Sequence, residues 1–381
     1  MSAFSLRNEA GEIKLVTIVG ARPQFIKAAS VTRSIREYNS RMHERRIQEV
    51  MVHTGQHYDE NMSQIFFDEL EIPEPAYNLG VGSGSHGKMT GTMLEKIEEV
   101  MLKEHPDILL VYGDTNSTLA GAIAAAKLHV PVGHVEAGLR SFNRRMPEEI
   151  NRVLTDHVSS LLLCPTETAV RNLRAEGITK GVFNIGDVMF DSFLYNKRLA
   201  ERKSKILAKM GLKPKSFCLA TVHREENTTS LERLAGIFQV LDELATPECT
   251  FVVPLHPRTS KALSEMEDRH NFSLAVRLLD PISYLDMIQL EANAKVILTD
   301  SGGVQKEAYF AGVPCVTLRE ETEWVELVEN GFNMLGGHDP DRIREAFETM
   351  AERDVYINRD LYGDGKASEE TISILCKFLD V

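Results

Sequence analysis

Positive charge is the first thing that this chain lacks. Its 381 residues include 43 Lys and Arg against 56 Asp and Glu, for a formal net charge of −13. A broad nucleic-acid surface, or a surface that docks on anionic lipid, needs the opposite sign, so neither is expected. A small anionic ligand is still compatible with this balance where local Arg and Lys side chains offset it.

The chain also lacks long hydrophobic runs and a cysteine framework. No apolar run approaches the roughly 20 residues that span a bilayer, and residues 1–12 are polar, without the apolar core of a signal peptide. The five cysteines are odd in number and contain no C-x-x-C pair, and Cys164, Cys218 and Cys315 lie in apolar runs. We therefore expect a cytoplasmic protein that does not bind membranes, with buried thiols and no disulfide or zinc framework.

A complete nucleotide motif is missing as well. No G-x-G-x-x-G follows the first strand, where Gly20 to Lys27 read GARPQFIK, so a dinucleotide cofactor is not expected. A Walker A loop begins at Gly82 and reaches Gly87-Lys88, but Met89 stands where a metal-binding hydroxyl is required. The preceding ELEIPEPAYNLG has little strand character. These departures favour a flexible Gly/Ser loop before a helix, so the phosphate site has to be sought elsewhere.

What the chain does contain is a regular alternation of short apolar runs and longer helical segments. Segments such as 118–129 and 231–244 carry apolar residues near i, i+3 and i+4, which is typical of helices. This alternation predicts parallel sheets that are covered on both faces. The expected strands are 14–20, 50–55, 108–114, 130–136, 160–165, 217–223, 249–256, 294–300 and 314–319.

Two sets of strands indicate an α/β protein with two Rossmann-like domains that face a cleft. The boundary is expected within 186–213, where a strand end passes through a charged helix to a Pro-Lys turn. We predict an N-terminal domain over 1–186 and a C-terminal domain over 187–363. Parallel α/β sheets bind ligands at the carboxyl ends of their strands, so candidate residues are sought there.

Two strand ends are candidate anion sites. After AKVILTD, the turn Ser301-Gly302-Gly303 opens a helix, whose backbone N–H groups and dipole favour an anion. Glu307, further along that helix, could accept hydrogen bonds from ribose hydroxyls, although an ordinary turn with a solvated Glu is an equal alternative. At the end of the first strand, Arg22 and Lys27 form a cationic pair that suits a diphosphate.

Several acids lie at or just beyond strand ends. Asp114 ends ILLVYGD, Glu136 ends VPVGHVE, and Glu148 and Glu149 follow a proline in RRMPEEINR. Structural roles compete: Asp114 could cap a helix, and the two adjacent glutamates are typical first-turn acids. If these acids converge, they raise one another's pKa, which makes a general acid or base usable near neutral pH.

A histidine ends the first strand of the second domain. His223 follows FCLATV, and a strand-end histidine is a catalytic candidate with even odds against a buried core histidine. His53 and His57 have i, i+4 spacing, but the glycine between them disfavours a helix, so no metal site is predicted.

Taken together, these pieces resemble the non-hydrolysing UDP-N-acetylglucosamine 2-epimerase family. The resemblance runs from Val16 to about Tyr362 and implies a GT-B-like fold, with a last helix of about 364–381 that returns to the first domain. Its motifs, in chain order, are GARPQFIK, HTGQH, VYGDTNSTLAG, PVGHVEAGLRS, MPEEINR, TVHREEN, PLHPRT, LTDSGGVQKEA and YGDG.

The resemblance implies roles for individual positions. Catalytic roles fall on Asp114, Glu136, Glu148 and His223. Met287 stands where the family often has a Phe stacked on uracil, and methionine can still contact a ring face. The implied UDP-binding and sugar-binding residues are Arg22, Lys27, Arg140, Arg224, Met287, Ser301, Gly302, Gly303 and Glu307.

The implied reaction is inversion at C2 of a UDP-sugar through elimination and re-addition of UDP, with no metal or other cofactor. GARPQFIK, RSFNRRMPEEINR, GDVMFDS and TEWVELV look closest to the branch that acts on UDP-2,3-diacetamido-2,3-dideoxyglucuronate. A homodimer that supplies precursors of cell-surface polysaccharide is expected. The alternatives are a retaining GT-B glycosyltransferase, a hydrolysing epimerase that releases free N-acetylmannosamine, and a non-catalytic UDP-sugar sensor.

Overall fold

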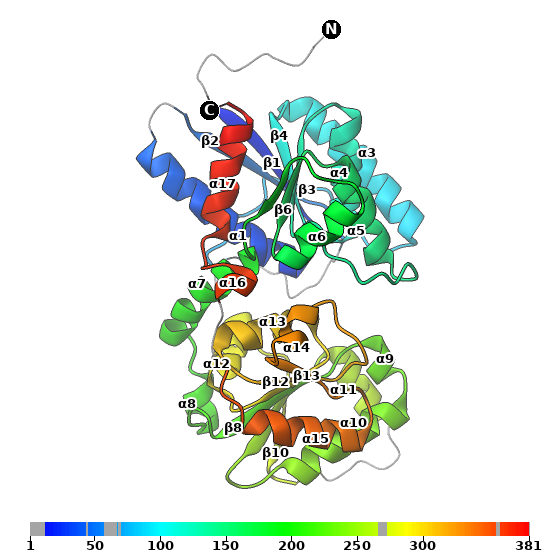
Figure 1. The fold of residues 1–381 in the computed structure, drawn as a ribbon, viewed down its shortest axis with the longest axis vertical. Coiled ribbons are helices and arrows are strands. Elements are labelled where there is room, and N and C mark those ends of the chain that lie inside the picture. The colour runs from blue at the N-terminus through cyan, green and yellow to red at the C-terminus, as the bar shows by residue number, and fades with distance from the viewer. Residues whose placement is uncertain are drawn as a thin grey trace. The chain divides into compact units, whose positions relative to one another are not determined.

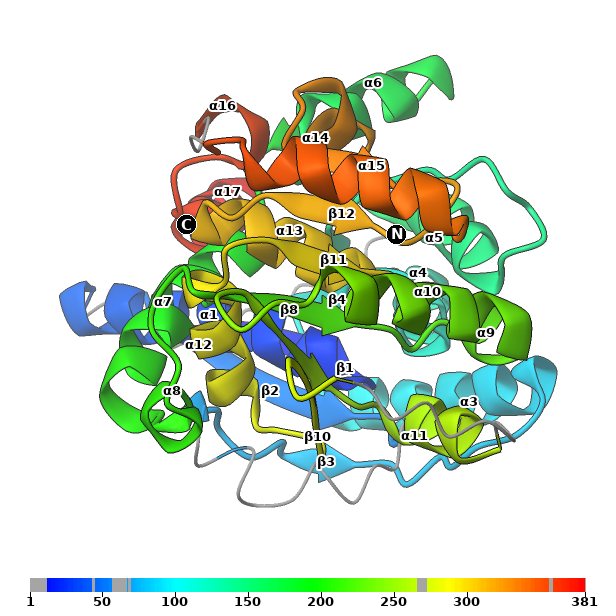
Figure 2. The same cartoon turned by 90° about the horizontal axis from the view of Figure 1, so that it is seen from below.

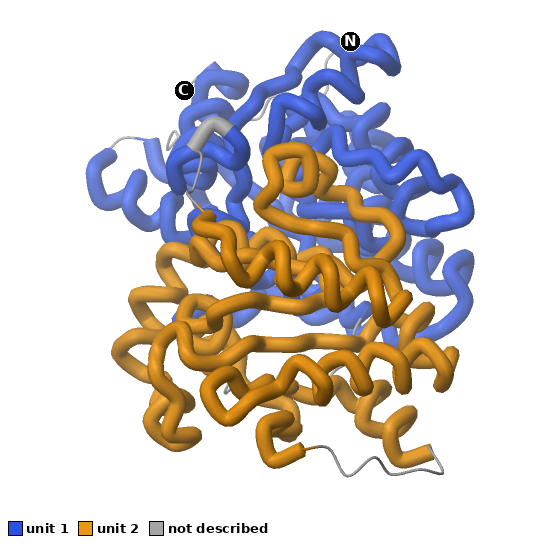
Figure 3. Tube along the Cα trace, turned by 60° about the horizontal axis from the view of Figure 1, so that its bottom comes forward, with its two compact units in different colours: residues 1–192, 359–381 blue, residues 193–358 orange. Residues whose placement is uncertain are grey.

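The chain forms two compact α/β units. The computed structural model describes residues 12–42, 45–56, 67, 70–265, 273–355 and 359–380. Unit 1 comprises residues 1–192 and 359–381, and unit 2 comprises residues 193–358 (Figure 3). Helix α7 (Val188–Lys203) carries the chain from unit 1 into unit 2. None of the helices in the described residues is both long enough and apolar enough to cross a bilayer.

Unit 1 contains a seven-stranded, entirely parallel sheet in the order β3-β2-β1-β4-β5-β6-β7. Its central strands are continuous apolar runs because both faces of the sheet are covered. The strands are β1 (Ile13–Val19), β2 (Ile47–His53), β3 (Tyr77–Asn78), β4 (Ile108–Tyr112), β5 (Val132–Val135), β6 (Leu161–Cys164) and β7 (Val182–Asn184).

Helices of unit 1 pack on its sheet, and the final helix, α17, lies beside α1 (Figure 1). One face is covered by α3 and α4, which bury Met93, Ile97 and Ala120 against β1, β2 and β4. The helices are α1 (Arg22–Arg41), α3 (His86–Glu104), α4 (Asn116–Lys127), α5 (Pro147–Val158), α6 (Glu167–Ala175), α16 (Arg359–Tyr362) and α17 (Ala367–Phe378).

Unit 2 repeats the architecture with six parallel strands in the order β10-β9-β8-β11-β12-β13. Its strands are β8 (Phe217–Thr221), β9 (Thr250–Pro254), β10 (Val276–Leu279), β11 (Ile297–Thr299), β12 (Cys315–Thr317) and β13 (Asn333–Leu335). Its remaining helices are α8 (Ile206–Met210), α9 (Glu225–Thr228), α10 (Leu231–Leu244), α11 (Pro257–Ser264), α12 (Tyr284–Asn293), α13 (Gly302–Ala311), α14 (Val325–Glu329) and α15 (Pro340–Ala351).

Two hydrophobic clusters cover the two faces of the unit 2 sheet. Leu234 and Phe238 of α10 pack with Ile343 of α15 on one face. Leu290 of α12 and Ala308 of α13 pack on the other, next to Phe217. Figure 2 shows these helices from below. This layering leaves the loops after the strands as the places where polar side chains gather.

The near-Walker A stretch forms an exposed loop that leads into α3. The helix begins at His86, after Ser85 in extended conformation, and residues Gly82 to Lys88 are exposed. β3, which pairs with β2 at the sheet edge, ends at Asn78, so the glycines do not follow a buried strand directly. The loop therefore lacks the strand–turn–helix context of a phosphate-binding P-loop.

Candidate active site

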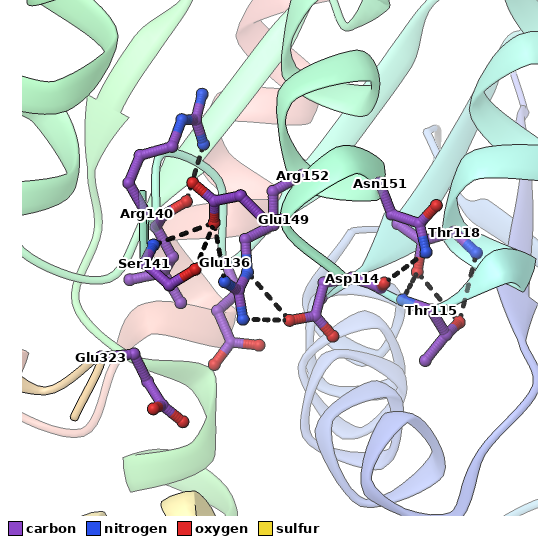
Figure 4. A network of polar contacts seen from close by, with 12 residues as sticks. Asp114, Thr115, Thr118, Glu136, Arg140, Ser141, Glu149, Asn151, Arg152 and Glu323 are labelled. Carbon is purple, nitrogen blue, oxygen red and sulfur yellow. Dashed lines mark hydrogen bonds and ion pairs between the residues drawn. The ribbon is translucent and has the colours of Figure 1, made fainter. Parts of the chain in front are cut away.

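Asp114 follows β4 and is held by an arginine that sequence reasoning missed. Arg152 of α5 donates from Nε at 2.9 Å and from Nη2 at 2.5 Å to the same Asp114 oxygen (Figure 4). Asp114 does not cap α4, because Thr115 does so by accepting from the Thr118 backbone N–H. The Asp114 side chain is 30% exposed, so Arg152 orients a carboxylate on a side chain that is only partly buried.

Glu136 follows β5 with a backbone conformation that is unusual for a residue with a side chain. Its φ is +73°, in the left-handed region that favours glycine. Its carboxylate pairs with the Lys27 ammonium of α1 and lies against Gly113, where an added Cβ would be 3.3 Å from Glu136 Oε2. Backbone strain of this kind collects at functional sites, where the surrounding structure holds it.

The structure brings Asp114 and Glu136 together. Burial raises the pKa of Asp114 above its usual range, and the negative charge of Glu136 raises it further. The positive charges of Arg152 and Lys27 act in the opposite direction but do not cancel this rise. A carboxyl with a raised pKa beside a second carboxyl can share with it the roles of proton donor and acceptor.

Gln24 ties the turn after β1 to the end of β4, the strand that Asp114 follows. Its side-chain oxygen accepts from the backbone N–H groups of Gly20 and Ala21, at 2.8 and 3.1 Å. Its amide nitrogen donates to the Tyr112 carbonyl at 2.6 Å. The turn before Arg22, which is the first residue of α1, is thereby tied to the end of β4.

The adjacent glutamates of α5 have different environments. Glu149 is buried and accepts from the Ser141 N–H, the Phe142 N–H and Arg152, all within 3.0 Å. Burial alone would raise the pKa of Glu149, but these hydrogen bonds lower it below its usual range. Glu148, the predicted catalytic residue, is exposed in the first turn of the same helix.

Arg140, which the resemblance assigns to substrate binding, is buried and bonded within the protein. Its side chain is 1% exposed, with two bonds to Glu176, one to Asp156 and one to the Leu139 carbonyl. Asp156 also accepts from His134, whose other ring nitrogen, Nε2, donates to the Gly113 carbonyl at 2.7 Å. This buried network holds the loops after β4 and β5 through their backbone carbonyls at Gly113 and Leu139.

In unit 2, His223 is oriented by Asp300. The Asp300 carboxylate follows β11 and accepts from the His223 and Arg224 backbone N–H groups and from the Asn227 amide, at 2.9 to 3.0 Å. Nδ1 of His223 lies 3.1 Å from the same carboxylate. Burial alone would raise the pKa of Asp300, but the hydrogen bond and charge of His223 help to lower it. The His223 side chain is 36% exposed.

The predicted anion turn is the N-terminus of α13. Ser301 caps the helix by accepting from the Val304 N–H. An added Cβ at Gly302 would lie 2.4 Å from Glu323 Oε1, so a carboxylate sits at this helix end. Arg319 binds that carboxylate at 2.8 Å, and Arg224 Nη2 lies 3.9 Å from it. The turn therefore already attracts a negative group.

Glu307 of α13 is buried, so it is not the solvated surface glutamate of the alternative interpretation. It is 5% exposed and accepts a hydrogen bond from the Tyr284 hydroxyl at 2.7 Å. Met287, on the same helix as Tyr284, packs partly buried against the hydrophobic cluster below it. Sequence reasoning missed the Tyr284 contact because the two residues are 23 positions apart.

His53 and His57 are the two histidines at i, i+4 spacing for which the sequence predicts no metal site. His53 ends β2 and contacts Phe25 edge-on, and burial lowers its pKa to about 4. His57 lies outside the described residues.

Two parallel-sheet units with ionisable groups after their strands define an α/β enzyme with a GT-B-like fold, and the predicted fold class is confirmed. Residues 40–376 match the family described as UDP-N-acetylglucosamine 2-epimerase, and the chain belongs to that family of isomerases. The predicted enzyme class is therefore confirmed.

Known relatives cover almost the whole chain. A protein named UDP-N-acetylglucosamine 2-epimerase homolog, from Methanococcus maripaludis, is 54% identical over 95% of this chain and 99% of its own. The UDP-2,3-diacetamido-2,3-dideoxy-D-glucuronate 2-epimerase of Pseudomonas aeruginosa is 50% identical over 96% of this chain and 100% of its own. The solved UDP-GlcNAc 2-epimerase of Methanocaldococcus jannaschii, in complex with UDP-GlcNAc and UDP, has a TM-score of 0.84 and 43% identity over 96% of this chain and 99% of its own.

Proposed function

We propose that this enzyme inverts C2 of a UDP-N-acetylhexosamine without releasing a free sugar. The observation that carries the proposal is the pair of Asp114 and Glu136, two carboxyls brought together after β4 and β5 beside Lys27 and Arg152. The proposed route is elimination and re-addition, which uses acids and cations already present and needs neither NAD nor a metal.

The proposed reaction passes through a 2-acetamidoglucal intermediate. A carboxylate removes the C2 proton while the C1–O bond breaks, so UDP departs with the bonding electrons and C1=C2 forms. The resulting 2-acetamidoglucal then accepts a proton at C2 on the opposite face, and a phosphate oxygen of UDP re-adds at C1. Asp114, Glu136 and Glu148 supply the acid and base groups, and His223 Nε2 stabilises the departing phosphate.

Unit 2 supplies the proposed nucleotide site. Ser301, Gly302 and Gly303 offer backbone N–H groups to the diphosphate, and Glu307 accepts from the ribose hydroxyls. Met287 contacts the uracil. Arg224 binds phosphate once its contact with Glu323 gives way. In unit 1, Arg22 at the start of α1 is a further phosphate-binding candidate. Lys27 pairs with Glu136 in this structure. Its proposed role is therefore to bind the Glu136 carboxylate as well as the diphosphate of the substrate.

The proposed substrate is UDP-N-acetylglucosamine or its 2,3-diacetamido-glucuronate analogue. The 50% identity to the Pseudomonas relative supports the analogue, as does Trp324 in the sequence TEWVE. Arg144 and Arg145 are exposed ahead of α5 and are candidates for the uronate carboxylate.

We propose a cytoplasmic homodimer that supplies precursors of cell-surface polysaccharide. The free cysteines among the described residues support a reducing compartment. On α5, Ile150, Leu154 and Val158 follow an i, i+4, i+8 spacing and are 38 to 44% exposed, and Phe142 nearby is 76% exposed. Such an apolar stripe is suited to a second copy of the chain.

The test is incubation with each UDP-sugar alone in deuterated water. Epimerisation with deuterium at C2 and no free sugar, followed by NMR, is the expected result. Release of UDP with free N-acetylmannosamine would favour the hydrolysing alternative, and absence of exchange without an acceptor would favour a glycosyltransferase. Binding of UDP without any turnover would indicate a sensor.

The matched variant is Glu136→Gln, which keeps the shape but removes the charge. We expect kcat to fall by about 10²- to 10⁴-fold while UDP binding stays near normal. Glu99→Gln, the same change at an exposed position of α3, is the control and should leave kcat unchanged. Unchanged turnover in Glu136→Gln would remove Glu136 from the mechanism.

A further inference from the structure

Two cysteines of unit 2 lie in contact at a place that the proposed reaction does not use. Cys249 is partly exposed, whereas the other four cysteines of the chain are buried. Its Sγ lies 3.2 Å from Sγ of Cys218, which is 0% exposed. Cys218 is near the amino end of β8 and Cys249 comes just before β9, while His223 follows the carboxyl end of β8. The thiol pair is therefore at the edge of the sheet opposite the candidate active site.

A closed turn holds Cys249 beside β8. Thr246 and Cys249 exchange two backbone hydrogen bonds of 3.1 Å, and the Thr246 hydroxyl accepts from the Cys249 N–H at 3.0 Å. The strand that follows pairs with β8 in parallel, with Thr250 opposite Phe217. Both thiols pack against the same hydrophobic cluster under α10, so they lie on one face of the sheet.

The two thiols differ in reactivity as well as in exposure. The thiolate is the reactive form of cysteine. The hydrogen bond from the Cys218 S–H lowers the pKa of Cys249 to about 7; burial opposes this change and the positive charge of Lys295 assists it. The same hydrogen bond, together with burial, raises the pKa of Cys218. Cys249 is thus the thiol suited to react first, and Cys218 is the buried thiol suited to follow.

A metal site is not the better interpretation of this pair. A structural zinc ion takes four protein ligands, and the part of the chain that the structure describes contains no group of three or more His, Cys, Asp or Glu side chains that could hold an ion. Two thiols in contact are instead the arrangement from which a disulfide forms. The sulfur atoms have to approach from 3.2 Å to about 2.0 Å. Cys249 lies in a turn and not inside a strand, which permits that movement.

We propose that Cys249 and Cys218 form an oxidative modification site, a dithiol that hydrogen peroxide converts into an intramolecular disulfide. The Cys249 sulfur donates an electron pair to one peroxide oxygen, the O–O bond breaks, and the departing hydroxide takes up the proton that the Cys249 thiol has released. The Cys218 sulfur then attacks the Cys249 sulfenic acid, the S–S bond forms and the S–O bond breaks. The second hydroxide leaves with the Cys218 proton, so two thiols and one peroxide give one disulfide and two waters.

The disulfide has a structural consequence that does not depend on the proposed function. It closes residues 218–249 into a loop that contains His223 and α10. A cross-link of this kind restricts the unfolded chain and so stabilises the folded state. The bond forms at the amino ends of the strands, so we expect it to leave the position of His223, and therefore kcat, nearly unchanged.

The experiment treats the reduced full-length enzyme with a small excess of hydrogen peroxide, alkylates the remaining thiols and measures the mass of the protein and of its peptides. We expect the alkylated thiols to fall from five to three, with Cys218 and Cys249 in one linked peptide pair, and dithiothreitol to restore all five. Tm should rise by roughly 5 to 15 °C on oxidation. A stable sulfinic acid at Cys249, a link to another cysteine or to a second chain, or no reaction at Cys249 would overturn the proposal.

Three variants separate the roles of the two thiols. In Cys218→Ala we expect oxidation of Cys249 to stop at the sulfenic acid, which dimedone traps, and the rise in Tm to disappear. Cys249→Ala should not form the cross-link at all, whereas Cys376→Ala, the matched change in α17 of unit 1, should form it as the parent does. Loss of two thiols in Cys249→Ala, or a cross-linked parent without a rise in Tm, would contradict the assignment.

Failure of this proposal is distinguishable from failure of the proposed function. If Cys218→Ala does not fold, the peptide map of the parent and the response of Cys249→Ala, a change at a partly exposed position, decide the matter. Exchange of deuterium at C2 by the reduced parent enzyme tests the proposed function without reference to either thiol.

Discussion

Each unit contains an aspartate–histidine pair, and the two pairs differ in exposure. In unit 1, His134 and Asp156 are both fully buried, 2.7 Å apart, and the second ring nitrogen of His134 is bonded to the Gly113 carbonyl. In unit 2, Asp300 is fully buried, but the His223 side chain is 36% exposed. All polar side-chain atoms of the first pair are hydrogen-bonded within the protein. In the second pair, Asp300 holds a His223 ring that is partly exposed to solvent.

The same contrast applies to the acids and shows how to separate structural from functional polar groups. Glu149 and Asp156 are buried carboxylates whose partners lie in the protein, and their pKa values are lowered despite burial. Asp114 retains a raised pKa and partial exposure. We therefore expect catalysis from side chains that the protein holds through hydrogen bonds but leaves partly exposed. Variants of the buried and of the partly exposed groups distinguish the two roles.

The largest effect is expected at His223. In His223→Asn the amide takes the place of Nδ1 and keeps the contact with Asp300, while Nε2 is removed. We expect kcat to fall by about 10²- to 10⁴-fold with Tm unchanged, measured by steady-state assay and calorimetry. The matched variant, His134→Asn, should lower Tm instead, because a buried hydrogen bond is lost. A variant of His223 that loses stability but not turnover would reverse the assignment of the two pairs.

The next effect is expected at Asp156. In Asp156→Asn, Arg140 keeps its bonds to Glu176 but loses a second buried carboxylate, and His134 loses its carboxylate acceptor. We expect about 3 kcal/mol of stability to be lost at neutral pH. For a unit of this size that lowers Tm by roughly 6 to 12 °C.

The pH dependence of that loss has a defined sign. Burial would raise the pKa of Asp156, but the hydrogen bonds and charges of His134 and Arg140 lower it below the unfolded value of about 3.9. The stabilisation is therefore fully present above that value and is lost as pH falls through the lower folded pKa. The stability gap between the parent and Asp156→Asn should shrink on acidification below about pH 4; a constant gap would contradict the role of this charge.

The central part of the fold was predictable from the sequence, and the edges were not. All nine expected strands are present, because buried parallel strands are continuous apolar runs. The four strands that were not predicted, β3, β7, β10 and β13, are the four edges of the two sheets. They have two to four residues and are partly exposed, so no apolar run marks them.

For the site, the strand-end rule found single groups but not their partners. It found Asp114, Glu136 and His223, and the same rule could have found Asp300, which ends the strand before the glycine turn. Arg152 and Tyr284 lie inside helices and reach Asp114 and Glu307 across 38 and 23 positions, which no local pattern reveals. The burial of Arg140 depends likewise on Glu176, 36 positions away.

The smallest and most local test uses the adjacent glutamates of α5. In Glu149→Gln the amide cannot accept all the bonds that Ser141, Phe142 and Arg152 donate, so we expect a loss of about 1 to 2 kcal/mol of stability. Glu148→Gln, one position earlier and exposed, should change stability by less than about 0.5 kcal/mol yet lower kcat by roughly tenfold or more. Denaturant titration and steady-state assay of both variants measure the two effects. If Glu148→Gln left kcat unchanged, exposed Glu148 would have no role in the reaction. Asp114 and Glu136 alone would then have to provide the acid and the base for the two faces of C2.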